Sequence, residues 1–475
     1  MTAMWPQRRP GSPRPSTGAP DLRSYLEELS RRYPEELRTV QKAVDPGWEV
    51  TAVAVALERV GRRPALLFKR VDGTPYPVVT NLFASRRRMA LALGVEEREL
   101  SAAFRAREAR LVDPELVDGQ DAPVRQVVAT GEEVTLRGLP RISHNEKDSG
   151  PYITSGAMVV KDPDTGIRNI GIYRHKIHDD RRLGIHLAET SHAWLIYQKY
   201  RDRGETMPVA ITVGHHPAFY LGVLSFVPFG TDEYSVVGAL MERPLRLVRA
   251  ATVPLEVPAD AEFVIEGYVP PEERADEGPF GEYGGTYGKV LRNPVIHVTG
   301  MMRRADPVYL DVVSGYPDHQ LLGGTPRLSF IHRMASVASP GVREVFMPPS
   351  AYCRLACYVS MRKRVEGEPK NVACAVLAAD PFIRYVIVVD EDVDVFDERA
   401  VLEAVYRNVR AESDVFSVPG AKGHPLDPLV ESGGAKGMQV TKIGIDATRP
   451  VDAAAEKARP AGLERVDLRA MELDS

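Results

Sequence analysis

The chain has 475 residues, too many for one hydrophobic core, and its 44% hydrophobic and 27% charged residues are typical of a soluble protein with several domains. Its 61 Lys and Arg residues are balanced by 65 Asp and Glu residues, a formal charge of −4, which argues against a nucleic-acid partner. Three cysteines are too few for a disulfide framework and favour a reducing cytoplasm, and the lack of any run of about 18 apolar residues predicts no membrane span.

The first 115 residues divide into a tail and a domain. Residues 1–20 contain five prolines and no apolar segment like that of a signal peptide, so we expect a disordered tail. Asp21 can cap a helix with an apolar face, the sequence PALLFKRV from 64 to 71 predicts a strand, and Ser85 can cap a short helix. These signals predict an N-terminal α/β domain over 21–115.

The middle of the chain, residues 116–320, is rich in short strands punctuated by Gly, Pro and Asp, a pattern typical of a β-barrel or sandwich. One helix interrupts them and begins near Thr190 or Ser191. The expected strands are QVVATG, ITSGAMVVKD, IRNIGIYRHKI, PVAITVG, AEFVIEGYV, NPVIHVTGMMRR and PVYLDVVSG.

The last third returns to an α/β pattern over residues 321–448. RYVIVVDED is an almost uninterrupted apolar strand of the kind buried on both faces, and VLEAVYRNV follows it as a helix. The acidic run 388–399 lacks the glycine of a calcium-binding EF-hand loop and is interpreted as a solvated turn. Residues 449–475 are expected to be a partly helical tail.

The strand segment RNIGIYRHKIH, 168–178, places Arg174 on the same face as isoleucines. A guanidinium on an apolar face either leaves the sheet at its rim or is held by a buried carboxylate, because an unpaired buried charge is costly. The sequence leaves these two alternatives open.

The stretch EGPFGEYGGTYG, 277–288, holds two acids, Glu277 and Glu282, on a backbone with five glycines. So many glycines predict an irregular loop in which the backbone can approach a ligand closely. A glutamate on such a loop can be held at a reacting centre.

Asn169, His192 and Glu233 supply an amide oxygen, an imidazole and a carboxylate, a donor set that suits manganese or magnesium. His192 also falls in the first turn of the predicted helix, where free N–H groups favour an anion such as phosphate. A structural histidine at a helix start is the alternative. His215 and His216 either line a pocket mouth or are one solvated and one packed histidine.

Taken together and in order, these segments resemble the UbiD family of reversible decarboxylases. The resemblance covers about residues 20–450, and it rests on RNIGIYR, SHAW, VGHHPA, DEYSVVGAL, EGPFGEYGG, the strand with its acidic turn and KIGIDAT. It implies a central split β-barrel that binds prenylated FMN with a divalent metal, usually manganese, and a potassium ion. It also implies a C-terminal domain that makes homodimers or larger homo-oligomers, a carboxylic acid substrate, and an FMN prenyltransferase as the supplier of the cofactor.

The family's functional positions fall on residues already noted. The resemblance makes Asn169, His192 and Glu233 the metal and phosphate site, and Arg174, Glu277 and Glu282 the catalytic set. In that set Arg174 holds the substrate carboxylate, Glu277 orients Arg174, and Glu282 is the proton donor. Further contacts with the flavin are implied for a group of residues in short motifs and for one arginine near its phosphate: Thr154, Ser155, Ile170, Ser191 and Arg384.

The leading hypothesis is therefore a prenylated-FMN-dependent decarboxylase of an α,β-unsaturated, aromatic or heteroaromatic acid. Loss of CO2 leaves a carbanion that the substrate cannot delocalise well, so a cofactor must accept the electrons. Two alternatives remain at this point: an oxidoreductase that uses ordinary FMN on the same barrel, and a non-catalytic scaffold subunit.

Overall fold

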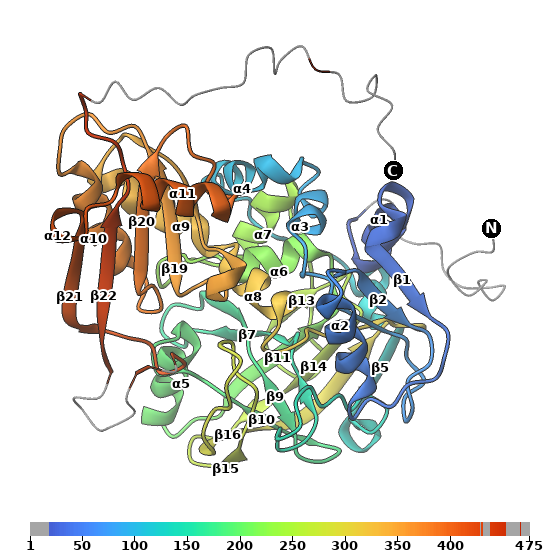
Figure 1. Cartoon of the computed structure of the whole chain (residues 1–475). Coiled ribbons are helices and arrows are strands. Elements are labelled where there is room, and N and C mark those ends of the chain that lie inside the picture. The colour runs from blue at the N-terminus through green and yellow to red at the C-terminus, as the bar shows by residue number, and fades with distance from the viewer. Residues whose placement is uncertain (1–18, 428, 431–437, 453–465, 467–475) are drawn as a thin grey trace.

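The computed structural model describes residues 19–427, 429–430, 438–452 and 466. Within these residues the strands form four sheets, and the fold combines an N-terminal α/β region, a central curved sheet and a C-terminal α/β domain (Figure 1). This is the α+β multidomain class that the sequence predicts. The two predicted tails, 1–20 and 449–475, lie mostly outside the described residues.

The N-terminal region begins with a helix whose start follows directly from the sequence. The Asp21 side chain accepts a hydrogen bond from the Ser24 backbone N–H at 2.8 Å, and the apolar face of the helix is buried. Ser85 caps α3 in the same way, as predicted. The elements are α1 Leu22–Arg32, β1 Leu37–Val40, α2 Glu49–Arg59, β2 Ala65–Phe68, β3 Val78–Thr80, α3 Arg86–Ala92 and α4 Leu100–Glu108.

The central sheet follows the order β6-β9-β10-β16-β14-β11-β7-β8, with β5 and β15 both paired to the long strand β16. Its two end strands, β6 and β8, do not pair with each other within the described residues, so the sheet is open there, as in a split barrel. The strands are β5 Val127–Thr130, β6 Tyr152–Ile153, β7 Ala157–Lys161, β8 Arg168–Ile172, β9 His175–Ile177, β10 Arg182–Ile185, β11 Met207–Val213, β14 Phe263–Val269, β15 Arg274–Glu277 and β16 Leu291–Arg303.

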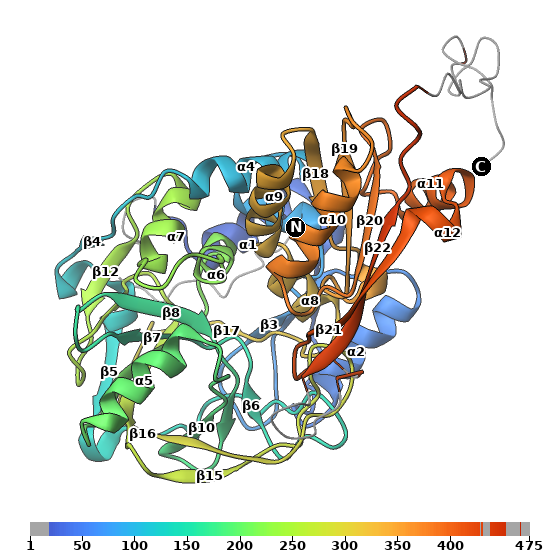
Figure 2. The same cartoon turned by 90° about the vertical axis from the view of Figure 1, so that its left-hand side faces the viewer.

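Helices and a small sheet accompany the central sheet. Helix α5 lies along the outside of the strands in both views, and α6 and α7 lie beside β8 (Figure 2). Ser191 caps α5, so the helix begins where the sequence predicts. These elements are α5 His192–Asp202, α6 Pro217–Val223, α7 Glu233–Met241, β4 Glu115–Leu116, β12 Arg246–Arg249 and β13 Glu256–Pro258.

The C-terminal domain is a five-stranded sheet of order β18-β19-β20-β22-β21. Helices α9 and α10 pack on one face and α11 on the other, which explains why the strand RYVIVVDED is apolar on both sides. The elements are α8 Pro317–Gly324, α9 Arg327–Ala338, β18 Val342–Phe346, β19 Ala356–Met361, α10 Glu368–Ala379, β20 Tyr385–Asp390, α11 Glu398–Asn408, α12 Ala411–Asp414, β21 Val415–Lys422 and β22 Gln439–Asp446.

One predicted barrel strand belongs elsewhere. PVYLDVVSG forms only a short strand, β17 Tyr309–Leu310, which pairs in parallel with β3 and so completes the N-terminal sheet. The prediction was wrong because a short apolar run carries no information about its pairing partner. In the described residues, no helix is long and apolar enough to cross a membrane.

Candidate functional site

Arg174 occupies the break between β8 and β9, where the strand alternation ends. Its guanidinium is held by two carboxylates: Nε and Nη2 donate to Glu277 at 2.9 and 3.0 Å, and Nη1 donates to Glu282 at 2.5 Å. The guanidinium also lies 4.7 Å from the centre of the Phe280 ring. The sequence left open whether Arg174 leaves the sheet at its rim or is held by a buried carboxylate. The structure confirms the second alternative, with two carboxylates instead of one.

Glu277 ends β15 and is fully buried. Besides the two hydrogen bonds from Arg174, it accepts a hydrogen bond at 2.9 Å from Nδ2 of Asn293, a residue of the neighbouring strand β16. Burial alone raises the pKa of Glu277, but the contacts with Arg174 outweigh burial and hold the pKa below its ordinary value. Glu277 is therefore an ionised carboxylate that fixes the orientation of Arg174.

Glu282 lies on a tight loop, where its backbone N–H donates to the Thr286 carbonyl at 2.8 Å. Glycine is required close by, since a Cβ on Gly288 would overlap the Glu282 carboxyl group. Burial raises the pKa of Glu282 above its ordinary value in spite of Arg174, and the charge of Glu277 adds to this. The pKa values of two carboxyl groups on one arginine are thus shifted in opposite directions.

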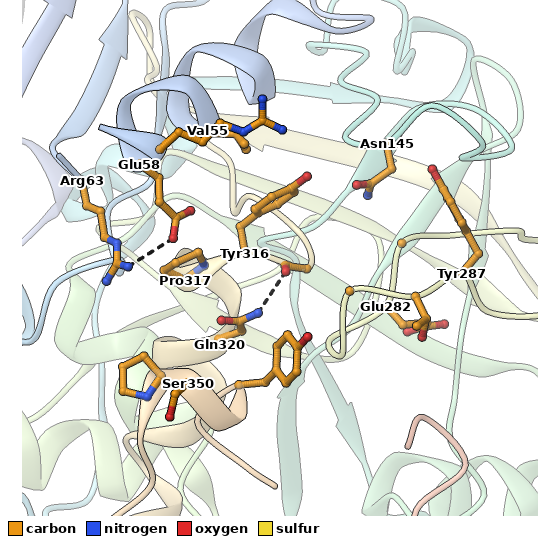
Figure 3. A pocket seen from close by; sticks show the side chains of 17 residues that line it. Val55, Glu58, Arg63, Asn145, Glu282, Tyr287, Tyr316, Pro317, Gln320 and Ser350 are labelled. Carbon is orange, nitrogen blue, oxygen red and sulfur yellow. Dashed lines mark hydrogen bonds and ion pairs between the residues drawn. The ribbon is translucent and has the colours of Figure 1, made fainter. Parts of the chain in front are cut away.

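A cavity of about 750 Å³ adjoins the loop. Glu282, Asn145 and Tyr287 lie at one end, while Val55, Glu58 and Arg63 of the N-terminal region lie at the other (Figure 3). Arg63 and Glu58 form an ion pair at 3.2 Å. Glu282 is 6% exposed and lines the cavity, so it lies between Arg174 and a space of the size that small ligands or water occupy.

The predicted metal ligands are brought together in part. Asn169 Nδ2 and the Ile170 backbone N–H both donate to the Glu233 carboxylate at 2.8 Å. Oδ1 of Asn169 is buried and has no hydrogen-bond partner among the residues that the structure describes, and burial raises the pKa of Glu233 to about 8. An amide oxygen without a partner beside a carboxylate that makes no ion pair in the same part of the chain fits a hard divalent metal.

His192 is the first residue of α5, and burial lowers its pKa, which keeps the ring neutral as a metal ligand requires. Tyr173 connects this helix start to the other ligands, because it is hydrogen-bonded with Ser191 and close enough to feel the charge of Glu233. Among the described residues, no hydrogen bond or ion pair joins His192 to Asn169 or Glu233. The described residues also contain no group of three His, Cys, Asp or Glu side chains that could hold a metal ion. The predicted set contains only two residues of these types, because its third member is Asn169.

The other predicted flavin contacts have partners within the protein. Thr154 Oγ1 donates to Asp311 at 3.0 Å, and Ser155 Oγ donates to the Leu310 carbonyl at 2.6 Å, so both hydroxyls hold the segment around β17. Arg384 lies in the C-terminal domain with its Nε 3.1 Å from Asp427. The structure therefore does not bring Arg384 into contact with the other predicted site residues.

The histidine pair VGHHPA packs against aromatic rings. His215 is buried, and its Nδ1 accepts from the His216 backbone N–H at 2.8 Å, while His216 caps α6 through the Ala218 N–H. The His215 ring lies beside Phe219 and the partly buried His216 ring is edge-on to Tyr25, and neither histidine lines the cavity beside Glu282. Sequence reasoning also missed Asn293, since an asparagine before a proline is typical of a turn and gives no sign of its cross-strand partner.

Comparison with known proteins places the chain in a class, the carboxy-lyases. Three family models match consecutive parts of the chain: the N-terminal domain of 3-octaprenyl-4-hydroxybenzoate carboxy-lyase over 30–107, its Rift-related domain over 115–317, and its C-terminal domain over 320–447. The chain belongs to the UbiD family and is a decarboxylase of that family.

Several relatives are similar over nearly the whole chain. Anhydromevalonate phosphate decarboxylase of Methanothermobacter thermautotrophicus is 34% identical and aligns over 92% of this chain and 98% of its own. The UbiD-class enzyme HmfF of Pelotomaculum thermopropionicum, solved in complex with FMN, has a TM-score of 0.89 at 35% identity and covers 95% of this chain and 100% of its own. An evolved dimeric form of HmfF in complex with prFMN has a TM-score of 0.86 at 32% identity, with 95% and 100% covered.

Proposed function

We propose that the protein is a prenylated-FMN-dependent decarboxylase of an unsaturated, aromatic or heteroaromatic carboxylic acid. The observation that carries the proposal is the single arginine, Arg174, shared by an ionised Glu277 and by Glu282, whose pKa is raised. Decarboxylation needs both functions at one place, a cation for the carboxylate that leaves and a proton for the carbon that remains.

Arg174 would bind the substrate carboxylate through Nη1, the nitrogen that donates to Glu282 in this structure. Glu277 keeps the other two nitrogens engaged, so the guanidinium stays oriented during this exchange. Glu282, once released from the arginine, would carry a proton and deliver it to the carbon that lost CO2. Because Glu282 also lines the cavity, water there can replace the proton after each turnover.

The flavin, when bound, would accept the electron pair left by the departing CO2. Asn169, His192 and Glu233 would hold a manganese or magnesium ion, and the free N–H groups at the start of α5, which Ser191 caps, would bind the flavin phosphate. Thr154 and Ser155, between β6 and β7, and Ile170, in the neighbouring strand β8, are assigned to flavin contact. A potassium ion near the phosphate and a phosphate contact from Arg384 are carried over from the family and stay predictions.

The carboxylic acid is proposed as a class. Relatives named for their reactions act on two kinds of acid, anhydromevalonate phosphate in the archaeal protein and 3,4-dihydroxybenzoic acid in a Klebsiella pneumoniae enzyme that is 27% identical with a TM-score of 0.86. We also propose a homodimer or larger homo-oligomer built through the C-terminal domain, which light scattering after gel filtration would test.

The deciding experiment is mass spectrometry of the cofactor released from protein produced with an FMN prenyltransferase, with metal content measured on the same sample. We expect the mass of prenylated FMN together with manganese, and CO2 release from at least one acid of a cinnamic, furan, phenolic and anhydromevalonate panel. Protein produced without the prenyltransferase is the control. Unmodified FMN reduced by a nicotinamide cofactor would instead support an oxidoreductase, and no flavin would support a scaffold subunit.

A further inference from the structure

The loop that carries Glu282 closes into a tight turn. Gly281 and Tyr287 face each other as an antiparallel bridge, and the Glu282 backbone N–H donates to the Thr286 carbonyl at 2.8 Å. Glu282 is therefore the first residue of the turn that this bridge closes. The place of its carboxyl group depends on how the two bridge residues are held.

Residues 144–149, which we call the strap, precede β6 and hold both bridge residues from outside. Asp148 Oδ1 accepts a hydrogen bond from the Gly281 backbone N–H at 2.8 Å. The backbone N–H of Lys147 donates to the Tyr287 hydroxyl at 3.1 Å. The strap is thus bonded to the loop directly before Glu282 and again at the end of the turn.

The strap and the loop also fit closely beside these bonds. A Cβ on Gly281 would overlap Nδ2 of Asn145, so a larger residue there would push the two segments apart. The Ser149 N–H donates to the Pro279 carbonyl at 3.0 Å. A shift of the strap would therefore be passed to the backbone at Glu282.

Asp148 joins the two segments through its carboxylate. While Oδ1 accepts from the loop, Oδ2 accepts from the backbone N–H groups of His144 and Asn145 at 3.2 and 2.9 Å. Asp148 is partly buried, and no ion pair of its carboxylate occurs among the described residues. Backbone N–H groups of the strap and the loop therefore hold this carboxylate, and it fixes one segment against the other.

The charge of Asp148 also acts on the proposed proton donor. Burial raises the pKa of Glu282 above its ordinary value, Arg174 opposes burial, and the negative charges of Glu277 and Asp148 raise the pKa further. Asp148 therefore favours the form of Glu282 that carries a proton.

Further titratable and charged groups surround the loop and the strap. His144 is buried near Asp148; burial lowers its pKa, but Asp311 and then Asp148 outweigh burial and raise it. His319 of α8 lies edge-on to Tyr283, and burial lowers its pKa to about 3, so its ring is neutral. The charged groups that lie over Tyr283 or line the cavity are Arg354, Glu58, Arg59 and Arg63. Loss of Asp148 would lower the pKa of His144 and leave these other charges in place.

We propose that Asp148 is a positioning residue for the proton donor, holding the backbone at Gly281 so that the Glu282 carboxyl group lies between Arg174 and the cavity. The inference rests on the proposed function, in which Glu282 delivers the proton, and extends it to the residue that fixes Glu282 for this step. A displacement of about 1 Å caused by a change away from the reacting atoms can cost roughly 100-fold in rate.

The first test is Asp148→Ala, which removes the acceptor of all these N–H groups. We expect kcat to fall roughly 10- to 100-fold, because Glu282 is displaced, while KM changes little, because Arg174 still binds the carboxylate. A general acid loses its activity as the pH rises through its pKa. Since Glu282 loses a negative neighbour, the basic limb of the kcat profile should also move to lower pH.

Two further variants separate positioning from general stability. Asp148→Asn lacks the charge but keeps one oxygen as an acceptor, so we expect it to recover part of kcat and to keep the shifted basic limb. Glu146→Gln is the matched control, because Glu146 is an exposed acid of the same strap, and it should behave like wild type. A lower Tm in both Asp148 variants with wild-type kcat and pH profile would make Asp148 merely structural and overturn the inference. If Asp148→Ala does not fold, the pH profile of Asp148→Asn decides.

Hydrogen–deuterium exchange separates failure of this inference from failure of the proposed function, because it requires no substrate. In Asp148→Ala the Gly281 N–H loses its acceptor, so peptides covering residues 278–288 should exchange faster than in wild type and in Glu146→Gln. Peptides from α11 of the C-terminal domain should exchange at the same rate in all three proteins. That result would support the role of Asp148 even if the wild-type protein released no CO2 from any acid. Exchange of the loop at the wild-type rate in Asp148→Ala would overturn it.

Discussion

Replacing Glu277 by glutamine is the sharpest perturbation of the proposed site, because it removes one charge without changing the size of the side chain. Three N–H groups approach the two oxygens of Glu277, two from Arg174 at 2.9 and 3.0 Å and one from Asn293 at 2.9 Å. An amide has only one oxygen, so in either orientation its NH2 group faces another donor. The Glu277→Gln variant therefore loses at least one hydrogen bond and the charge that balances Arg174.

The cost follows from burial. Removing one partner of a buried ion pair costs about 3–5 kcal/mol, and the lower end applies here because Arg174 keeps Glu282. A domain of this size loses about 2–4 °C in Tm per kcal/mol, so we expect Tm to fall by roughly 6–12 °C. The pKa of Glu277 is lowered in the folded protein, so its stabilising effect is present above the unfolded pKa and is lost as the pH falls through the folded pKa. The Tm difference from wild type should accordingly shrink in acid.

The same change alters Glu282. Without the negative charge of Glu277, Arg174 interacts more strongly with Glu282, and the pKa of Glu282 should fall. A general acid works in its protonated form, so its activity is lost as the pH rises through its pKa. The basic limb of the kcat profile should therefore move to lower pH.

Thermal unfolding and pH profiles of kcat on the holoenzyme test both expectations. Asp276→Asn is the matched control, since Asp276 precedes Glu277 in β15 and its side chain is 75% exposed. We expect the control to have the Tm and the pH profile of kcat of the wild-type protein. A Glu277→Gln variant with unchanged Tm and an unchanged basic limb would refute the assignment of Glu277 as the carboxylate that orients Arg174.

The remaining predictions concern its neighbours. Glu282→Gln should keep flavin and fold but lose turnover at least 100-fold, and near-normal CO2 release would remove Glu282 as the proton donor. Arg174→Ala should lose turnover similarly, because no cation then binds the substrate carboxylate. An unchanged rate would show that Arg174 does not bind it. His192→Ala should instead purify with less metal and flavin, so full loading measured by metal analysis and absorbance would contradict the metal assignment. Gly288→Ala should lower kcat, since its Cβ would displace the Glu282 carboxyl group, whereas Gly138, whose built Cβ would meet only the Tyr76 ring at 3.9 Å, offers a control in Gly138→Ala.

Much of the architecture follows from the sequence alone. The caps at Asp21, Ser85 and Ser191 set helix starts because each side chain bonds a backbone N–H only two or three residues away. Strand β20 was predicted correctly for a similar reason, because burial on both faces of a sheet requires apolar side chains at consecutive positions. The glycines after Glu277 likewise predicted the irregular backbone that carries Glu282, whereas Glu277 itself ends strand β15.

Only the tertiary structure decided how distant residues combine. The strand period put Arg174 on an apolar face but did not identify Glu277, 103 positions away, as its partner. The same holds for Asn293, for the pairing of β17 with β3, and for Arg354 beside Tyr283. Local signals act through hydrogen bonds and periodicity over a few residues, whereas a buried charge finds its partner through the packing of the whole chain. The opposite pKa shifts of Glu277 and Glu282 depend on that burial, so only the folded chain specifies them.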